Sequence, residues 1–257
     1  MKALLTLEFG KLFHLSSLRF SLGLLALFPI VWAYAPGVFD LYGFFIVSGY
    51  QVPGLTLLSS MEFLLPLLVA IASAELVGLE RTYGTLPTVL LRPVTRSQWL
   101  LAKLLVALAY PFLLLAFLFL VALVSGVFFG YGEFVGGTGV GDAGLLGQGT
   151  TTPGAALSEL LRAYAVAAFS LVPIGLLAVL FTVVFMNAAG GALATLSVLI
   201  FMKLLVVFPG LDRFLLTEHL DAYAASSATL PWAMMLLAVY AAAFAALSVT
   251  LFERKDF

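Results

Sequence analysis

The feature that most constrains this chain is a set of long apolar stretches without a single charged side chain. Residues 104–129, 163–186 and 231–252 contain no Asp, Glu, Lys or Arg. An α-helix needs about 20 apolar residues to cross the hydrocarbon core of a bilayer, and each stretch reaches that length. Hydrophobic residues make up 63% of the chain and charged residues only 10%, which is too few charges to cover a soluble domain. The sequence therefore predicts an all-α polytopic membrane protein.

Six spans and the segments between them account for the chain as a single transmembrane domain over residues 1–257. Residues 37–55 are apolar but rich in Gly and Pro, so a loop and a short re-entrant piece stay open as alternatives. The sequence NAAGG at 187–191 is interpreted as a tight turn. The predicted spans lie at about 20–36, 56–77, 104–129, 163–186, 192–208 and 231–252, and the connecting segments are an interfacial helix at 1–19, a cytoplasmic loop at 80–103, a glycine-rich extracytoplasmic loop at 130–158 and an extracytoplasmic connector at 209–230.

The N-terminal residues 2–19 combine leucines near helical spacing with charged side chains. Lys2, Glu8, Lys11 and Arg19 are too polar for the lipid interior. This pattern predicts an amphipathic helix that lies on the membrane surface, although a polar lead-in to the first span is an alternative.

The distribution of Lys and Arg predicts the orientation of the chain in the membrane. Six spans place both termini on one side, and cytoplasmic segments carry an excess of positive charge. Both termini and the 80–103 loop are therefore predicted to be cytoplasmic. The net charge of −1 gives no indication of nucleic-acid binding, and the absence of Cys excludes disulfides and thiolate metal sites. Of the twelve Lys and Arg residues, nine lie on the termini and this loop: Lys2, Lys11, Arg19, Arg81, Arg92, Arg96, Lys103, Arg254 and Lys255.

Residues 80–103, ERTYGTLPTVLLRPVTRSQWLLAK, concentrate charged residues and helix breakers between two apolar spans. Gly84 suits the left-handed position at the end of a helix. Leu86, Val89 and Leu90 follow helical spacing and predict a short amphipathic helix that ends before Pro93. By physics alone, its apolar stripe can pack on the chain's own helices, lie on anionic lipid or fit a groove of a partner protein.

The second half of this loop begins a new helix that continues into span three. The sequence TRSQ, from Thr95 to Gln98, is a capping box. Trp99 and Lys103 are four residues apart and share a helix face, as an aromatic ring and a snorkelling cation do at a membrane interface.

The pattern E-x-x-x-G-T-L-x-x-x-L-x-x-P-V-[ST]-R, followed by Lys103, resembles the loop between spans two and three of bacterial ABC-2 type permeases. The resemblance implies a permease subunit of an ATP-driven exporter in a bacterial or archaeal cytoplasmic membrane. It also implies a working complex of two permease chains, identical or related, and two ATP-binding subunits. Pro87 inside the short helix departs from what a regular docking helix requires. The residues implied to contact the ATP-binding subunit are Glu80, Arg81, Gly84, Thr85, Leu86, Leu90, Arg92, Pro93, Val94, Thr95 and Arg96.

The sequence itself carries no energy-coupling or catalytic motif. The phosphate-binding pattern G-x-x-x-x-G-K-[ST] does not occur, and GVGDAG at 139–144 follows a predicted span rather than a strand. The two histidines, His14 and His219, lie far apart in sequence and outside the predicted spans. We therefore expect no catalytic residue, no metal site and no cofactor on this chain, with ATP and Mg²⁺ bound by the partner subunit.

Two charged residues fall deep inside predicted spans, where each is costly unless it is paired or hydrated. Glu62 in span two and Lys203 in span five each lie about six residues, or roughly 9 Å, from the outer end of their span. We expect them to pair, within one chain or across the dimer, or to face a common polar cavity. In ABC-2 type permeases, spans two and five border the translocation path and the dimer interface, so the resemblance implies that the two residues form an outer gate. A purely structural ion pair or an outward-snorkelling Lys203 is the alternative.

Two other functions compete with the exporter subunit. A secondary, proton- or ion-coupled transporter would use Glu62 and Lys203, but it predicts inverted internal repeats, and no convincing repeat relates residues 1–130 to 131–257. A membrane scaffold without transport is the third. The Phe- and Leu-rich spans and the two deep charges favour an amphiphilic or hydrophobic cargo.

Overall fold

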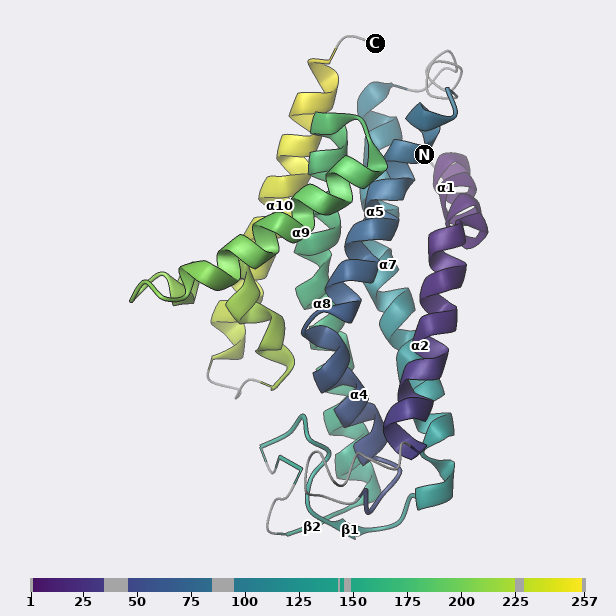
Figure 1. Cartoon of the computed structure of the whole chain (residues 1–257), viewed down its shortest axis with the longest axis vertical. Helices are drawn as coiled ribbons and strands as arrows, with labels where there is room; N and C mark the ends of the chain where they lie inside the picture. The colour runs from purple at the N-terminus through teal and green to yellow at the C-terminus, as the bar shows by residue number, and fades with distance from the viewer. Residues whose placement is uncertain are drawn as a thin grey trace.

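The computed structural model describes residues 2–34, 46–84, 95–142, 144–145, 149–224 and 229–255 as an almost entirely helical structure. Figure 1 shows the arrangement of its helices. The α-helices are α1 (Lys2–His14), α2 (Ser16–Tyr34), α4 (Gln51–Met61), α5 (Leu64–Thr82), α7 (Arg96–Ser125), α8 (Pro153–Phe185), α9 (Ala188–Leu205) and α10 (Leu230–Glu253); the shorter elements are the 3₁₀ helices η1 (Val127–Phe129), η2 (Asp212–Phe214) and η3 (Leu216–Ala224) and the strands β1 (Phe134–Val135) and β2 (Thr150–Thr151).

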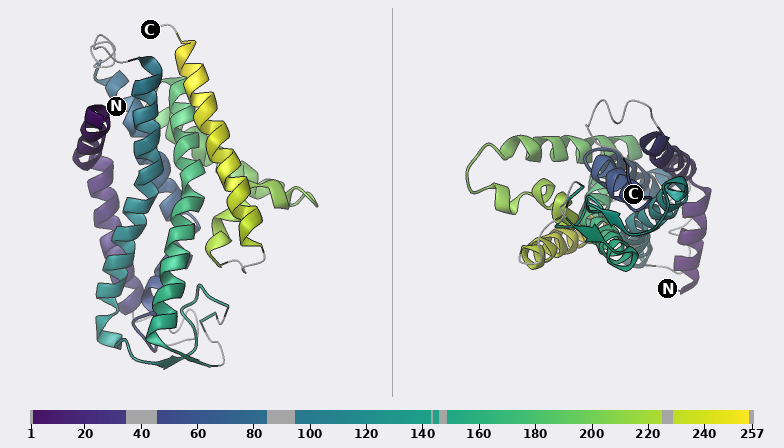
Figure 2. Two further views of the ribbon diagram at one scale, coloured as in Figure 1. Left: turned by 180° about the vertical axis from the view of Figure 1, so that it is seen from behind. Right: turned by 90° about the horizontal axis from the view of Figure 1, so that it is seen from below.

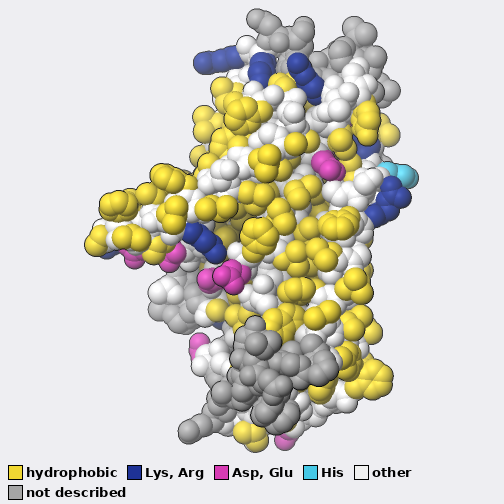
Figure 3. Space-filling view, viewed as in Figure 1, with side chains coloured by type: hydrophobic (Ala, Val, Ile, Leu, Met, Phe, Trp, Pro, Cys, Tyr) yellow, Lys and Arg dark blue, Asp and Glu magenta, His cyan; other side chains and the backbone are white. Residues whose placement is uncertain are grey.

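Helix α8 forms the centre of the bundle and packs against α5, α7, α9 and α10. In the most apolar part of α8, 78% of the residues are buried in protein, against 22% for α2 and α9 and 17% for α10. A helix that is apolar on all sides and enclosed by others contributes the core. The outer helices instead present apolar side chains to their surroundings, and hydrophobic side chains cover much of the face in Figure 3. Such a surface suits contact with lipid.

Within the described residues, five helices are long and apolar enough to cross a membrane, namely α2, α7, α8, α9 and α10. They correspond to predicted spans one, three, four, five and six. Helices α4 and α5 pass the same test only together, as a pair bent by 62°. The prediction of an all-α polytopic membrane protein is confirmed, and six spans result if the bent pair counts as one.

The bend between α4 and α5 corrects the prediction of a continuous span at 56–77. Helix α4 ends at Met61, and Glu62 and Phe63 form a turn before α5 begins. Pro66 explains the break, because it has no N–H to donate to the carbonyl of Glu62 and its ring clashes with that carbonyl in a continuous helix. The first turn of α5 instead closes with a 3.0 Å hydrogen bond from the N–H of Leu67 to the carbonyl of Phe63. Glu62 thus lies at a helix end rather than within a span.

Other predicted boundaries also shift. Helix α4 begins at Gln51, so the end of the predicted 37–55 loop is helical, while residues 35–45 lie outside the described residues. Helix α7 runs without interruption from Arg96 into span three, as predicted. Helix α8 begins at Pro153, inside the predicted 130–158 loop.

The predicted turn at 187–191 is wrong. The side-chain carbonyl of Asn187 accepts hydrogen bonds from the N–H groups of Ala189 at 2.9 Å and Gly190 at 3.3 Å, so it is the N-cap of α9. The turn is confined to Met186, whose positive φ of 54° ends α8, and to Asn187 itself.

The described residues between α7 and α8, predicted as part of a glycine-rich loop, are packed against the helices. Strand β1 pairs with β2 in a short antiparallel ladder. Thr138 is fully buried, and its hydroxyl donates to a carboxylate oxygen of Glu159 at 2.8 Å. A Cβ placed on Gly54 of α4 would lie 1.7 Å from the carbonyl oxygen of Thr138, so glycine permits this close approach.

The two chain ends and the facing ends of α5 and α7 lie at the same end of the bundle, and β1 and β2 lie at the opposite end (Figure 1). The shared side of the termini agrees with the predicted topology, while the side that faces the cytoplasm stays a prediction. Viewed along the bundle, α1 lies across its long axis (Figure 2, right). Helix α9 leaves the bundle obliquely, and η3 returns toward it.

Candidate functional site

Lys103, near the start of α7, is buried in the protein rather than exposed at an interface. Its side chain is 1% exposed, and its amine donates to Glu8 Oε2 at 2.8 Å, Glu80 Oε1 at 2.8 Å and the carbonyl of Leu76 at 2.5 Å. These contacts use all three donors of the ammonium group. The prediction that Lys103 snorkels at the membrane interface is therefore wrong, because two carboxylates compensate its charge inside the protein.

Lys11 completes a group of two lysines and two glutamates at this end of the bundle. Its amine lies 2.6 Å from Glu8 Oε1 and 2.7 Å from Glu80 Oε1. Burial lowers the pKa of Lys11, but the hydrogen bonds and charges of the two carboxylates outweigh it, and the pKa is raised. Trp99 donates from Nε1 to Glu80 Oε2 at 3.2 Å. We name these five residues the α1–α5–α7 cluster: Glu8, Lys11, Glu80, Trp99 and Lys103.

This cluster fastens the N-terminal helix to both helices that flank residues 80–103. Glu8 of α1 is 1% exposed, so the face of α1 that carries it points into the protein. Trp99 and Lys103 share a helix face as predicted, with the amine 4.9 Å from the ring centroid. Glu80, which the sequence assigned to a partner contact, is largely committed to contacts inside the chain.

The flanks of the predicted docking segment have the local structure that the sequence indicates. Gly84 follows α5 with a φ of +66°, and its N–H donates to the carbonyl of Arg81 at 3.0 Å. Thr95 and Gln98 form the predicted capping box at the start of α7. The remaining predicted contact residues, Thr85, Leu86, Leu90, Arg92, Pro93 and Val94, lie outside the described residues.

The C-terminal tail joins the same end of the molecule. Arg96 donates to the carbonyl of Lys255 at 2.8 Å. The amine of Lys255 donates to the carbonyls of Val183 at 2.5 Å and Val184 at 2.6 Å, which satisfies acceptors at the C-terminal end of α8. Burial, followed by the nearby charge of Arg81, lowers the pKa of Lys255. The start of α7 is thereby connected to the end of the central helix.

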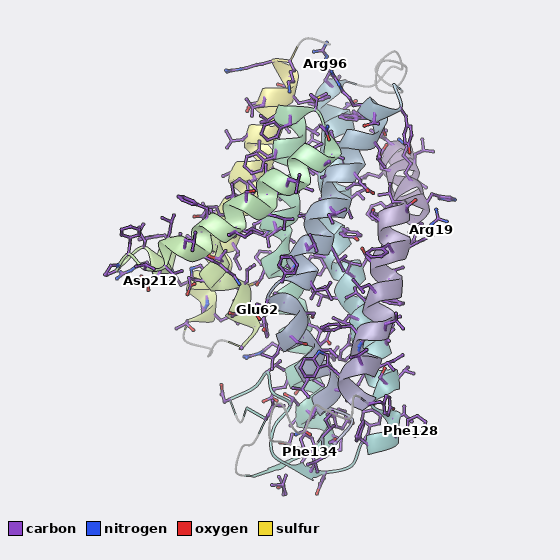
Figure 4. All side chains as sticks on the ribbon, viewed as in Figure 1. Arg19, Glu62, Arg96, Phe128, Phe134 and Asp212 are labelled. Atoms are coloured by element: carbon purple, nitrogen blue, oxygen red, sulfur yellow. The ribbon has the colours of Figure 1, made fainter. Side chains whose placement is uncertain are left out.

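The second predicted site, formed by Glu62 and Lys203, lies on one cavity of about 590 Å³. Glu62 is at the junction of α4 and α5, on the side toward η3 (Figure 4), and Lys203 is near the end of α9. Among the described residues, no ion pair within 4.0 Å joins the two side chains. Of the arrangements expected from the sequence, the structure has the shared polar cavity and not the direct pair within one chain.

The wall of this cavity opposite Glu62 comes from η3, which adds two further carboxylates, Glu218 and Asp221. Figure 3 shows Lys or Arg side chains beside Asp or Glu side chains in the hollow beneath α9. Partial burial raises the pKa of Asp221; the charge of Lys203 opposes this shift and that of Glu62 adds to it. These electrostatic contacts place Asp221 near both predicted gate residues.

A family model described as "Protein of unknown function (DUF2705)" matches residues 39–257. The chain belongs to the DUF2705 family. The match includes the bent helix pair, residues 80–103 and the whole cavity beneath α9. It does not include α1 or α2, so Glu8 and Lys11 lie outside the part of the chain that defines DUF2705 membership. A comparison with curated proteins finds no match.

The sequence did not single out three features of these sites in this DUF2705 chain. The sequence contained only a weak indication that Glu8 is buried, namely a lone carboxylate on an otherwise apolar helix face. Glu218 and Asp221 belong to the connector predicted at 209–230. Their position on the same cavity as Glu62 could not be predicted, because it depends on the oblique path of α9. The signal for the break at Glu62 was Pro66.

Proposed function

We propose that this chain is the permease subunit of an ABC-2 type exporter. In this proposal two permease chains form the translocation path, and a separate ATP-binding subunit docks on residues 80–103 of each. The observation that carries the proposal is the sequence pattern of this segment, from Glu80 to Arg96, together with the tight turn at Gly84 and the capped helix start at Thr95 that bracket it. The turn and the cap lie at the facing ends of the two long helices α5 and α7.

The helix packing supports a mechanical route from the ends of α5 and α7 that border residues 85–94 to the cavity. Helix α7 is continuous over 30 residues and packs on α2 and α8, so a displacement at its first turn is transmitted along the bundle. Helix α5 ends at the docking segment and begins beside Glu62. The bend at Glu62 is where a movement of α5 relative to α4 changes the shape of the cavity. Closure of the ATP-binding subunits would thus open or close the outer part of the path.

The proposed dimer and lipid contacts involve the outer helices. Helices α9 and α10 bury only a small share of their apolar residues within one chain. Ile200 and Leu204 of α9 are 58% and 65% exposed, respectively. A second copy or the bilayer covers this surface in the proposed complex.

Co-purification with an ATP-binding protein tests the proposal. The chain is expressed with its neighbouring reading frames, extracted in mild detergent and isolated through a tag. We expect an ATP-binding protein in the eluate and ATP hydrolysis by the complex. Charge reversal at Arg92 and Arg96 should reduce the amount of bound ATPase at least ten-fold, because both charges lie within the docking segment. The matched control is Arg213→Glu in η2, which should leave the complex intact. A chain that purifies alone, and remains alone in every variant, contradicts the proposal.

A second candidate function is a secondary transporter, favoured by one observation. Glu62 lies at the break of a discontinuous helix pair, and such breaks border ion and substrate sites in many secondary transporters. The two candidates differ in reconstituted vesicles. Solute movement driven by a proton gradient, without any ATP-binding protein, supports the secondary transporter, whereas dependence on the ATPase and ATP supports the exporter.

A further inference from the structure

The cavity beneath α9 combines a charged wall with an apolar wall. Glu62, Glu218 and Asp221 supply three carboxylates, and Lys203 supplies one amine. When all four are ionised, negative charges exceed positive charges by two. The apolar part of the lining includes Leu58 and Met61 of α4 together with Val206 and Leu220. A volume of about 590 Å³ is in the usual range of small-molecule sites.

One polar group in the lining lacks a partner. Thr217 of η3 is 5% exposed, and its hydroxyl has no hydrogen-bond partner among the described residues. A buried hydroxyl without a partner carries a desolvation penalty, and native structures normally satisfy such groups. Because this oxygen is inaccessible to solvent, it lies behind the cavity lining, and a molecule in the cavity does not reach it.

We propose that this cavity binds an amphiphilic organic cation, with an ammonium group toward Glu62 and Asp221 and a hydrocarbon part against the side chains of α4. The excess of carboxylates selects a positive charge. Lys203 opposes the ligand's charge and keeps the empty site partly neutralised. Binding is inferred from the cavity alone; that the cation is the exported cargo rests on the proposed function.

The test uses three probes with one hydrocarbon tail: octylammonium, octyltrimethylammonium and octanoate. The full chain is placed in phosphatidylcholine nanodiscs without any partner protein, and heats of binding are measured by titration calorimetry against empty nanodiscs. Octylammonium should bind saturably at one site per chain, and octanoate should give the heats of empty nanodiscs. Because no ATPase is present, the outcome of this titration is independent of the outcome of the co-purification experiment.

Four variants sharpen the assignment. Glu62→Gln and Asp221→Asn should each weaken octylammonium binding at least five-fold, since each removes an attractive charge. Lys203→Gln should tighten it at least two-fold, because a repelling charge is lost. Thr217→Val should change the affinity of neither octylammonium nor octyltrimethylammonium, because the hydroxyl oxygen of Thr217 is inaccessible from the cavity.

The control is Glu133→Gln, an exposed carboxylate outside the cavity whose loss should change neither affinity. Thermal unfolding of each variant verifies that the fold is retained. Three results overturn the inference: no saturable octylammonium binding, binding that all the variants retain unchanged, or saturable octanoate binding that Lys203→Gln abolishes. The last result would assign the cavity to an anion.

Discussion

At the scale of single residues, Lys103 shows how this chain accommodates a full charge inside a mostly apolar protein. The ammonium has three acceptors and two compensating carboxylates, so little of its hydrogen-bonding capacity is left unmet. Burying an ion pair gains little over an apolar pair of the same volume, but removing one partner leaves an uncompensated charge. We therefore expect a single substitution in the α1–α5–α7 cluster to lower the free energy of unfolding more than the substitution of both partners of a pair.

Lys103→Met should lower the free energy of unfolding by roughly 3 to 5 kcal/mol, because Glu8 then stays buried without a cation on α7. Denaturant titration in mixed micelles measures the loss. Lys11→Met is the matched control; its amine is half exposed, and its removal should cost about 1 kcal/mol or less. The double variant Glu8→Leu with Lys103→Met should recover at least half of the loss. Equal losses for both lysine variants, or no recovery, would show that the cluster does not stabilise the fold in this way.

At the scale of elements, the bend between α4 and α5 depends on one missing backbone donor. Pro66 removes the hydrogen bond to the carbonyl of Glu62, and the chain turns there by 62°. A proline inside an apolar stretch marks a possible break, but neighbouring helices decide how far the two halves diverge. The sequence therefore predicts where the helix bends but not the angle of the bend.

Pro66→Ala should straighten the pair, because alanine restores the donor. With spin labels at Val47 and Tyr83, both exposed, the interlabel distance should rise by up to about 6 Å, as expected from a rise of about 1.5 Å per residue and the loss of a 62° bend. Pulsed electron resonance measures this distance. An unchanged distance would assign the bend to packing, such as the close approach of Gly54 to Thr138, and not to the proline.

Hydropathy predicted most of the helices, whereas contacts between residues far apart in sequence were not predicted. Span six was predicted at 231–252 and is Leu230–Glu253, since its charges begin only at its end. The capping box at Thr95 was found because it depends on neighbours in sequence. Asn187 was read as part of a turn although its side chain caps α9. Contacts such as Glu8 with Lys103 join residues far apart in sequence, and no local pattern encodes which partner such a charge selects.

At the scale of the whole molecule, the end with both termini is held together by side chains from three helices, α1, α5 and α7, and from the C-terminal tail. Glu8 connects α1 to α7, and Glu80 connects α5 to both. Lys255 connects the C-terminal tail to α8. The opposite end is held by the packed segment around β1. The two ends differ in chemistry, with ionic contacts at one and close backbone packing at the other.

The orientation of these ends in the membrane is directly measurable, because the natural sequence contains no Cys. We expect Val135→Cys, 64% exposed on β1, to react with a membrane-impermeant maleimide in intact spheroplasts. Tyr83→Cys, 74% exposed after α5, should react only after the membrane is permeabilised. This pattern follows from the excess of Lys and Arg at the end with the termini. Reversed labelling would place residues 80–103 outside the cell and exclude docking of a cytoplasmic ATPase.

The contact between Glu8 and Lys103 also has a consequence for how the protein is made. Glu8 precedes its partner by 95 residues, so it leaves the ribosome well before α7 exists. Until then only Lys11, three residues away on the same helix, can compensate its carboxylate, so this part of α1 stays in contact with water. The first helix can settle into its final position only once α5 and α7 have been inserted. Helix α1 is thus synthesised before α5 and α7 but docks after them, and its docking completes the assembly of this end of the protein.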